Sequence, residues 1–226
     1  MTGVPDQLTL DLPHRPALGA EDFLISGSNR AAADIVDRWP DWPHRSVVVV
    51  APPGAGKTHL ANVWRLKSGA AAFAAGALSE PDVARATGAL LIEDLHAGIG
   101  DQRALFHLLN LVREHKLSML LTSRLAPGDL DVALPDLRSR LRALPVAALE
   151  PPDEALLKAV LVKLFADRQL TVEPAVIEYL SLRMERSMAA AERVVAAIYR
   201  LALAMHRKVT RPLAAEALAS LNEGGE

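Results

Sequence analysis

Short apolar runs alternate with amphipathic stretches over the first two thirds of the chain. Such runs are typical of strands that are covered on both faces, and they are found at 46–50, 71–74, 89–94, 117–122 and 144–147. Apolar residues recur at helical spacing at 30–39, 59–66, 80–86, 102–115 and 135–141. The alternation predicts an α/β fold in which a parallel sheet carries helices on both faces.

The pattern changes after residue 150. Helical periodicity fills the segments 153–168, 173–183, 187–205 and 211–221. Prolines stand near the start of the segments 153–168, 173–183 and 211–221, where a helix tolerates proline best. We therefore expect an α/β domain at 23–150 and a small all-helical lid domain at 151–226, preceded by an extended tail at 1–22.

The tail is rich in proline and poor in large apolar residues. Inside it Leu8, Leu10 and Leu12 alternate, which places them on one side of an extended segment. The pattern fits an arm that packs on its own domain as well as it fits a docking segment. After the tail we expect a short buried segment at 23–27, and then Ser28 and Asn29 at the start of a helix as its cap.

The stretch 51–58, with the sequence APPGAGKT, lies between a predicted strand and a predicted helix. This is the context of a phosphate-binding loop, in which backbone N–H groups and the helix start face the phosphates. Lys57 would add a full positive charge, and the Thr58 hydroxyl would bind Mg²⁺. Ala51 stands where the motif usually has glycine. The residues expected to bind nucleotide here are Pro53, Gly54, Ala55, Gly56, Lys57, Thr58 and His59.

Polar side chains end the next two predicted strands. Glu93 and Asp94 follow one apolar run, and the carboxyl end of a strand is where open α/β sheets place ligands. We expect Glu93 to hold Mg²⁺ together with Thr58, and Asp94 to orient or deprotonate an attacking water. A hydroxyl of Thr122 or Ser123 would sense the γ-phosphate, and an ordinary strand-end cap is the alternative.

Three arginines are candidates for contact with phosphate. Arg138 and Arg140 lie near the end of the α/β part, and a guanidinium there can enter a neighbouring subunit's site and stabilise phosphoryl transfer. Such a pair is also common on a solvated helix face. Arg186, in the helical part, would reach the nucleotide across a domain cleft or pair with a carboxylate.

Composition narrows the setting of these motifs. The net charge is −2, so no global basic field indicates nucleic acid, although a local basic patch remains open. The chain has no cysteine, which agrees with a reducing cytosol. Neither a signal peptide nor a membrane-spanning run is evident. We expect a soluble, cytoplasmic protein without a membrane partner.

The order of these motifs resembles the AAA+ ATPases, and more narrowly the bacterial replication initiator DnaA. The resemblance runs from about residue 20 to residue 221. The matching stretches are 23–30 with the sequence FLISGSNR, the phosphate loop, 90–94, 121–124 and 137–141.

Two features separate the chain from the initiator. We expect no helix-turn-helix domain after residue 221. The tail segment with Gln7, Leu8, Leu10 and Leu12 is similar to the motif that docks on the DNA polymerase sliding clamp. On these features the chain is identified as a member of the Hda family, and the segments 12–16 and 39–43 look like alphaproteobacterial members.

The resemblance implies a role in the regulatory inactivation of DnaA. The tail would bind the clamp, and Arg140 would be the arginine finger for ATP held by DnaA, so that DNA is contacted only indirectly. Arg186 would be the second nucleotide sensor, and Thr122 or Ser123 the first. The cofactors implied are ADP or ATP with Mg²⁺, with ADP often the active ligand in this family. The Glu93–Asp94 pair departs from the initiator's usual two aspartates.

Alternative functions remain open from the sequence. The chain would then be an autonomous AAA+ ATPase that serves as a loader or remodelling subunit, an initiator relative that binds DNA through its sheet domain, or a passive adaptor. Intrinsic ATP turnover, the resident nucleotide, self-association to a homodimer and the role of Arg138 are likewise left open.

Overall fold

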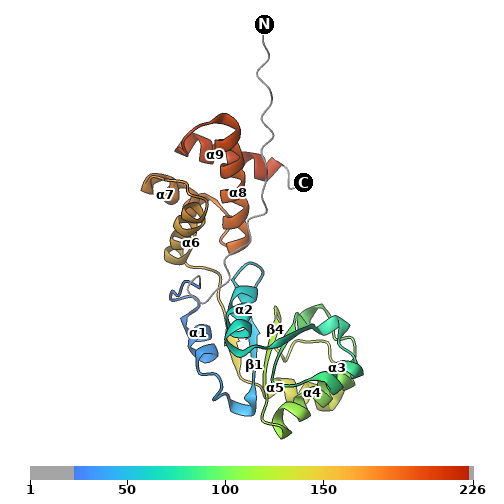
Figure 1. Cartoon of the computed structure of the whole chain (residues 1–226). Coiled ribbons are helices and arrows are strands. Elements are labelled where there is room, and N and C mark those ends of the chain that lie inside the picture. The colour runs from blue at the N-terminus through green and yellow to red at the C-terminus, as the bar shows by residue number, and fades with distance from the viewer. Residues whose placement is uncertain (1–22, 224–226) are drawn as a thin grey trace. The chain divides into compact units, whose positions relative to one another are not determined.

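The computed structural model describes residues 23–223. Within this range the chain forms two compact units, one of residues 23–153 and one of residues 154–223 (Figure 1). Each unit has its own hydrophobic core. The predicted tail at 1–22, with Gln7, Leu8, Leu10 and Leu12, lies outside the described residues.

The first unit is built on a parallel sheet of five strands in the order β2-β3-β4-β1-β5. The strands are β1 (Ser46–Val50), β2 (Ala71–Ala74), β3 (Ala89–Glu93), β4 (Ser118–Ser123) and β5 (Val146–Ala148). Val50 of β1 lies opposite Ser123 of β4, and Ile92 of β3 lies opposite Leu121. This register brings the carboxyl ends of β3, β4 and β1 to one edge of the sheet.

Helices cover both faces of this sheet, which confirms the predicted α/β architecture. α1 (Arg30–Asp37) and α2 (Lys57–Ser68) pack on one face, whereas α3 (Glu80–Arg85), α4 (Gln102–Glu114) and α5 (Pro135–Arg142) pack on the other. Side chains of a strand point to alternate faces. Val47 and Val49 therefore join the core under α1 and α2, and Val48 joins the core under α4 and α5.

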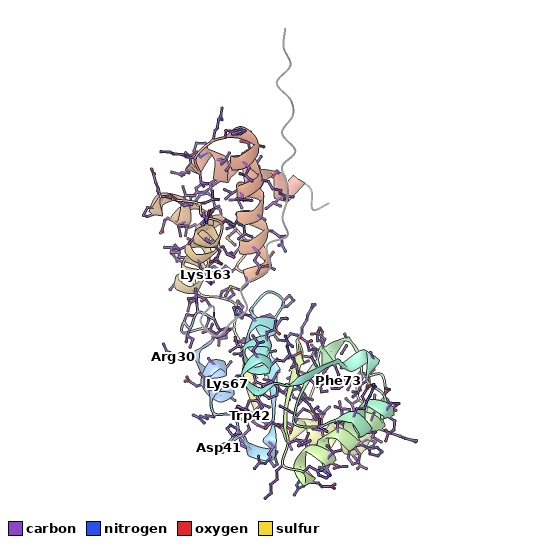
Figure 2. All side chains as sticks on the ribbon, viewed as in Figure 1. Arg30, Asp41, Trp42, Lys67, Phe73 and Lys163 are labelled. Carbon is purple, nitrogen blue, oxygen red and sulfur yellow. The ribbon has the colours of Figure 1, made fainter. Side chains whose placement is uncertain are left out.

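A tryptophan cluster anchors α2, the helix that follows the glycine-rich loop. Trp64 of α2 is fully buried. Trp42, which is labelled in Figure 2, stacks on Trp64 with 5.3 Å between ring centroids. Trp39 meets Trp64 edge to face at 6.4 Å. The Trp42 Nε1–H donates to the Ile35 carbonyl at 2.7 Å, which satisfies its one polar atom. The ring contacts hold α2 firmly on the sheet.

The second unit consists of α6 (Glu154–Asp167), α7 (Pro174–Arg183), α8 (Met188–Met205) and α9 (Arg211–Glu223). Its core includes Phe165, Leu180 and Val195. Ser187 caps α8, because its hydroxyl accepts the Ala190 N–H at 3.1 Å. Within residues 23–223, no helix combines the length and the apolar character needed to cross a membrane.

The segment before α1 differs from the prediction. Residues 23–27 were expected to be buried, yet Ile25 is 48% exposed. Asn29 occupies the cap position, but its side chain does not cap α1. Its Oδ1 accepts the Ser26 N–H at 2.8 Å, and its Nδ2 donates to the Leu24 carbonyl at 2.8 Å. Asn29 therefore fixes the preceding loop, which is a contact that sequence spacing does not reveal.

Gly100 lies in the loop between β3 and α4, where two backbone segments approach closely. Its N–H donates to the Ala75 carbonyl at 2.9 Å. A Cβ at Gly100 would lie 2.5 Å from the Gly76 carbonyl oxygen, a separation that neither backbone segment can relieve without moving. This contact positions the chain that leaves the acidic end of β3.

We predict that Gly100→Ala lowers the free energy of unfolding of the first unit by about 1–3 kcal/mol, the usual cost of overpacking. Tryptophan fluorescence during urea unfolding measures this, since all three tryptophans belong to that unit. Gly128→Ala is the matched control, because its Cβ would meet only the Arg142 Nε at 3.9 Å. Equal unfolding midpoints for the two variants would contradict the expected crowding.

Candidate nucleotide-binding site

The loop between β1 and α2 has the backbone conformation of an anion cradle. Gly54 and Gly56 have φ of 72° and 95°, in the region that favours glycine. Gly56 is the N-cap of α2, and a Cβ there would meet no atom within 4 Å, so the backbone conformation and not crowding calls for glycine. The first N–H groups of α2 carry the partial positive charge of the helix start.

Ala51 departs from the usual glycine without disturbing this loop. Its side chain is fully buried in the core shared with α2. Its N–H donates to the Ser123 carbonyl at 3.1 Å and so extends the pairing of β1 with β4. A methyl group therefore fits at this position.

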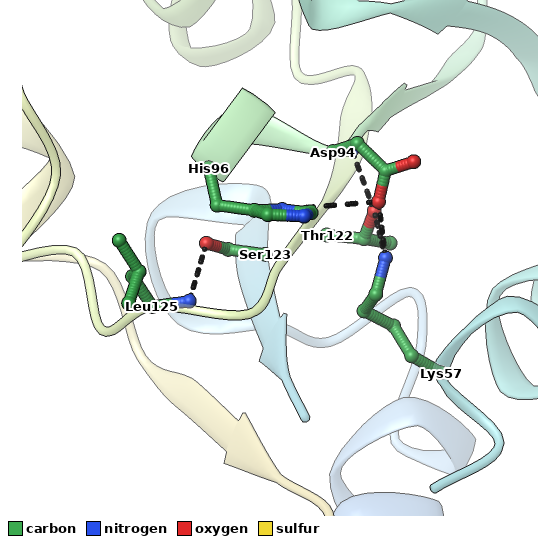
Figure 3. Close-up of polar contacts among 6 residues, drawn as sticks. All are labelled: Lys57, Asp94, His96, Thr122, Ser123 and Leu125. Atoms are coloured by element: carbon green, nitrogen blue, oxygen red, sulfur yellow. Dashed lines mark hydrogen bonds and ion pairs between the residues drawn. The ribbon is translucent and has the colours of Figure 1, made fainter. Parts of the chain in front are cut away.

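Lys57, the first residue of α2, lies at the centre of a polar cluster (Figure 3). Its ammonium group forms an ion pair with the Asp94 carboxylate and donates to the Thr122 Oγ1 at 3.3 Å. The same hydroxyl oxygen accepts the Asp94 N–H at 2.9 Å. Thr122 is fully buried, so one hydroxyl at the end of β4 ties the lysine to the residue after β3. Three of the predicted site residues thus come together.

The backbone at Asp94 turns the carboxylate toward Lys57. Asp94 has φ of 60° and ψ of 49°, a left-handed conformation that is uncommon for a residue other than glycine. Glu93, which ends β3, stays in the extended strand. Asp94 is therefore the carboxylate that pairs with Lys57, whereas the roles of Glu93 in Mg²⁺ binding and of Asp94 in catalysis stay predictions.

The charges in this cluster reinforce one another. The hydrogen bond from Lys57 is the main reason that the pKa of Asp94 is lowered, and burial opposes it. His96 lies beside Asp94, with 3.9 Å between its Nδ1 and the Asp94 Oδ1. Burial lowers the pKa of His96 despite the nearby carboxylate. His96 was not predicted from the sequence, although its place two residues after Asp94, at the acidic strand end, was a signal.

Thr122 and Ser123, the two predicted sensor hydroxyls, have different surroundings. Thr122 bridges Lys57 and Asp94, as described above. The Ser123 Oγ accepts the Leu125 N–H at 3.0 Å, which is the strand-end contact that the sequence left as the alternative. Of the two, only Thr122 contacts the polar cluster.

The start of α2 and the Lys57 ammonium fit the phosphates of a nucleotide. Lys57 already holds one anionic group, the Asp94 carboxylate. Its ammonium group and the N–H groups at the start of α2 are therefore suited to phosphate oxygens. Thr58 is exposed one residue later, and its hydroxyl would join the Glu93 carboxylate as an oxygen ligand of Mg²⁺.

The segment before α1 reaches the same helix start. Phe23 meets the His59 ring edge to face with 5.3 Å between centroids. Pro53, on the loop, is exposed. His59 was predicted as a site residue, whereas Phe23 was not. Phe23 stands before the GSN sequence at 27–29 and adds an apolar surface near the loop.

Arg138 and Arg140 of α5 are held in different ways. The Nε and Nη2 of Arg138 donate to the Val132 carbonyl at 3.0 and 2.7 Å. The Arg140 guanidinium lies over the Phe106 ring of α4, 5.0 Å from its centroid. Arg138 thus fixes the chain before α5, and Arg140 keeps its N–H donors available. The contact with Phe106 was not foreseen, because it joins two helices far apart in sequence.

Arg186 belongs to the second unit and is exposed just before the α8 cap. The hydrogen bond from Lys158 is the main reason that the pKa of Glu154 is lowered, and the Arg186 charge adds to it. Arg186 and Glu154 therefore interact electrostatically. The proposed contact of Arg186 with nucleotide stays a prediction.

Comparison with known proteins places this site on a familiar fold. No protein-family model matches the sequence. The chromosomal replication initiator protein DnaA of Cutibacterium acnes is 26% identical over a 200-residue alignment that covers 76% of this chain. That alignment covers 40% of the DnaA protein, so the chain spans less than half of this curated relative.

Solved structures show the same architecture. Domain III of the Thermotoga maritima replication initiation protein DnaA superposes with a TM-score of 0.76 at 19% identity, covering 92% of this chain and 98% of that chain. AMPPCP-bound DnaA from Aquifex aeolicus superposes with a TM-score of 0.70 at 19% identity, covering 85% and 68%. The chain therefore has the AAA+ fold of DnaA domain III.

We predict that Lys57→Met raises the pKa of Asp94 toward its ordinary value, because the hydrogen bond and the charge that lower it are lost. A lowered carboxyl pKa stabilises the fold above the unfolded pKa, and this stabilisation is lost as the pH falls through the folded pKa. Carboxyl ¹³C NMR titration of Asp94 measures the shift. Lys67→Met, which removes the exposed Lys67–Asp37 pair, is the control and should leave the titration unchanged; an unmoved midpoint in Lys57→Met would refute the pairing.

Proposed function

We propose that this chain is a nucleotide-bound regulator of the replication initiator DnaA, as in the Hda family. The observation that carries the proposal is the guanidinium of Arg140, presented on a DnaA-like AAA+ fold. Among the described residues no hydrogen-bond acceptor or carboxylate engages it, and its ring contact is with Phe106. A cation so placed is suited to a phosphate supplied by another molecule.

The chain's own nucleotide is ADP or ATP. On binding, the Lys57 ammonium exchanges the Asp94 carboxylate for phosphate oxygens, and the loop N–H groups and the start of α2 complete the contact. Mg²⁺, held by Thr58 and Glu93, would neutralise phosphate charge. Asp94 is then released from Lys57, and Thr122 reports the change because it contacts both residues. Arg186 serves as the second sensor.

The partner's nucleotide is the ATP held by DnaA. Arg140 supplies positive charge where phosphoryl transfer develops negative charge, and an arginine finger given in trans accelerates such reactions by about 10³–10⁵-fold. Hydrolysis takes place in the initiator's site and leaves its ADP form. The chain's own site then serves to shape the contacting surface rather than to turn over ATP.

The tail provides the tether. Gln7, Leu8, Leu10 and Leu12 would dock on the sliding clamp, so that the regulator reaches DNA only through the clamp. Tethering raises the effective concentration of the AAA+ unit near its partner without any new contact.

The test of this function is reconstitution of DnaA, clamp-loaded DNA and this protein, with initiator-bound ADP as the readout. We predict that Arg140→Ala lowers the stimulated hydrolysis by at least about 100-fold, because the charge supplied in trans is lost. Arg113→Ala, an exposed arginine at the far end of α4, is the control. Full stimulation by Arg140→Ala would remove the proposed role, and turnover without DnaA that Lys57→Ala abolishes would instead favour an autonomous ATPase.

We further predict that joint replacement of Gln7, Leu10 and Leu12 by alanine abolishes retention on clamp-loaded DNA, since the side chains that dock are removed. Nucleotide affinity, measured by calorimetry, should stay unchanged because the phosphate loop is untouched. Retention equal to that of the unaltered chain would speak against the tether. Retention on bare duplex with a steep salt dependence would favour direct DNA binding.

A further inference from the structure

We propose that Phe106 is a positioning residue for Arg140, an inference that rests on the arginine-finger role proposed above. Arg138 and Arg140 stand two positions apart on α5, so they project from different sides of the helix. The Nε and Nη2 of the Arg138 guanidinium both donate to the Val132 carbonyl. Arg140 places its guanidinium 5.0 Å from the centroid of the Phe106 ring.

The contact restrains the cation and leaves its hydrogen-bonding capacity intact. Attraction between a guanidinium and a ring acts through the face of the ring. The guanidinium N–H donors are not consumed by this contact, as they would be by a carboxylate. Arg140 is thus ordered before any phosphate arrives, and less side-chain freedom remains to be lost on binding.

The ring itself has a firm support. Phe106 lies on α4 between Leu105 and Leu108, which are buried in the core under this face of the sheet. The start of α4 is capped by Asp101, whose carboxylate accepts the N–H groups of Arg103 and Ala104.

A second contact fixes α4 against α5. The Gln102 Oε1, in the first turn of α4, accepts the Leu134 N–H directly before α5 at 2.9 Å. The platform and the helix that carries Arg140 therefore keep a constant separation. The position of the guanidinium follows from two packed helices rather than from one long side chain.

An aromatic side chain is what this arrangement requires. Leucine at 106 would fill most of the space but has no ring quadrupole to attract the cation. Tyrosine keeps the ring face and adds only a hydroxyl at its edge. The two substitutions thus separate the electrostatic role of the ring from its bulk.

The test combines an NMR measurement on the protein alone with the reconstituted reaction. In the unaltered chain, the Arg140 guanidinium N–H protons should shift upfield, because the guanidinium lies over the ring. In Phe106→Leu this shift should disappear, and the maximal rate of DnaA-bound ATP hydrolysis should fall about 2- to 5-fold, as expected for loss of a partly exposed cation–π contact. Phe106→Tyr should preserve both.

Controls separate the possible failures. Phe73→Leu removes a half-buried ring on β2 from the same core (Figure 2) and should change neither readout. Where Phe106→Leu fails to fold, by tryptophan fluorescence, Phe106→Met takes its place. An unshifted Arg140 signal in the unaltered chain, or equal rates for the leucine and tyrosine variants, would overturn the positioning role. Full stimulation by Arg140→Ala would overturn the proposed function itself.

Discussion

The ion pair between Lys57 and Asp94, joined by the Thr122 hydroxyl, is the interaction on which the rest of the site depends. It exists because the parallel register brings the ends of β1, β3 and β4 to one edge of the sheet. The left-handed turn at Asp94 adds local backbone strain, and the hydroxyl and the ammonium group offset it. A site that holds a lysine against an anion in this way is already arranged for phosphate.

Two cations, Lys57 and Arg140, have different proposed roles in nucleotide binding and hydrolysis. Lys57 belongs to the chain's own pocket and is held by an anion from the same fold. Arg140 lies on the opposite face of the sheet, on α5, and is held by a ring that leaves its donors uncommitted. This difference in partners, carboxylate against aromatic face, is the physical reason to assign one cation to the resident nucleotide and the other to a partner's.

Local patterns were enough to predict most of the fold. The apolar runs predicted the strands of the described sheet, both the largely buried β1, β3 and β4 and the more exposed β2 and β5. The glycines at 54 and 56 marked the positions of positive φ in the loop. Contacts between segments distant in the sequence could not be predicted from these local patterns. Three contacts depend on packing that short sequence spacings do not encode. They are the hydrogen bonds of Thr122 to Lys57 and Asp94, the Arg140–Phe106 contact and the hydrogen bond from Asn29 to the Leu24 carbonyl. Docking of the tail on the clamp and contact of Arg186 with nucleotide stay predictions.

The most direct test of this account compares ADP with adenosine by isothermal titration calorimetry on the full chain. If Lys57 and the start of α2 form a phosphate site, ADP should bind at least about 100-fold more tightly than adenosine, since ionic and helix-start contacts of this kind exist only with the phosphates. Equal affinities for the two ligands, or no binding of ADP, would contradict the claim that the cluster of Lys57, Asp94 and Thr122 is built to receive a nucleotide.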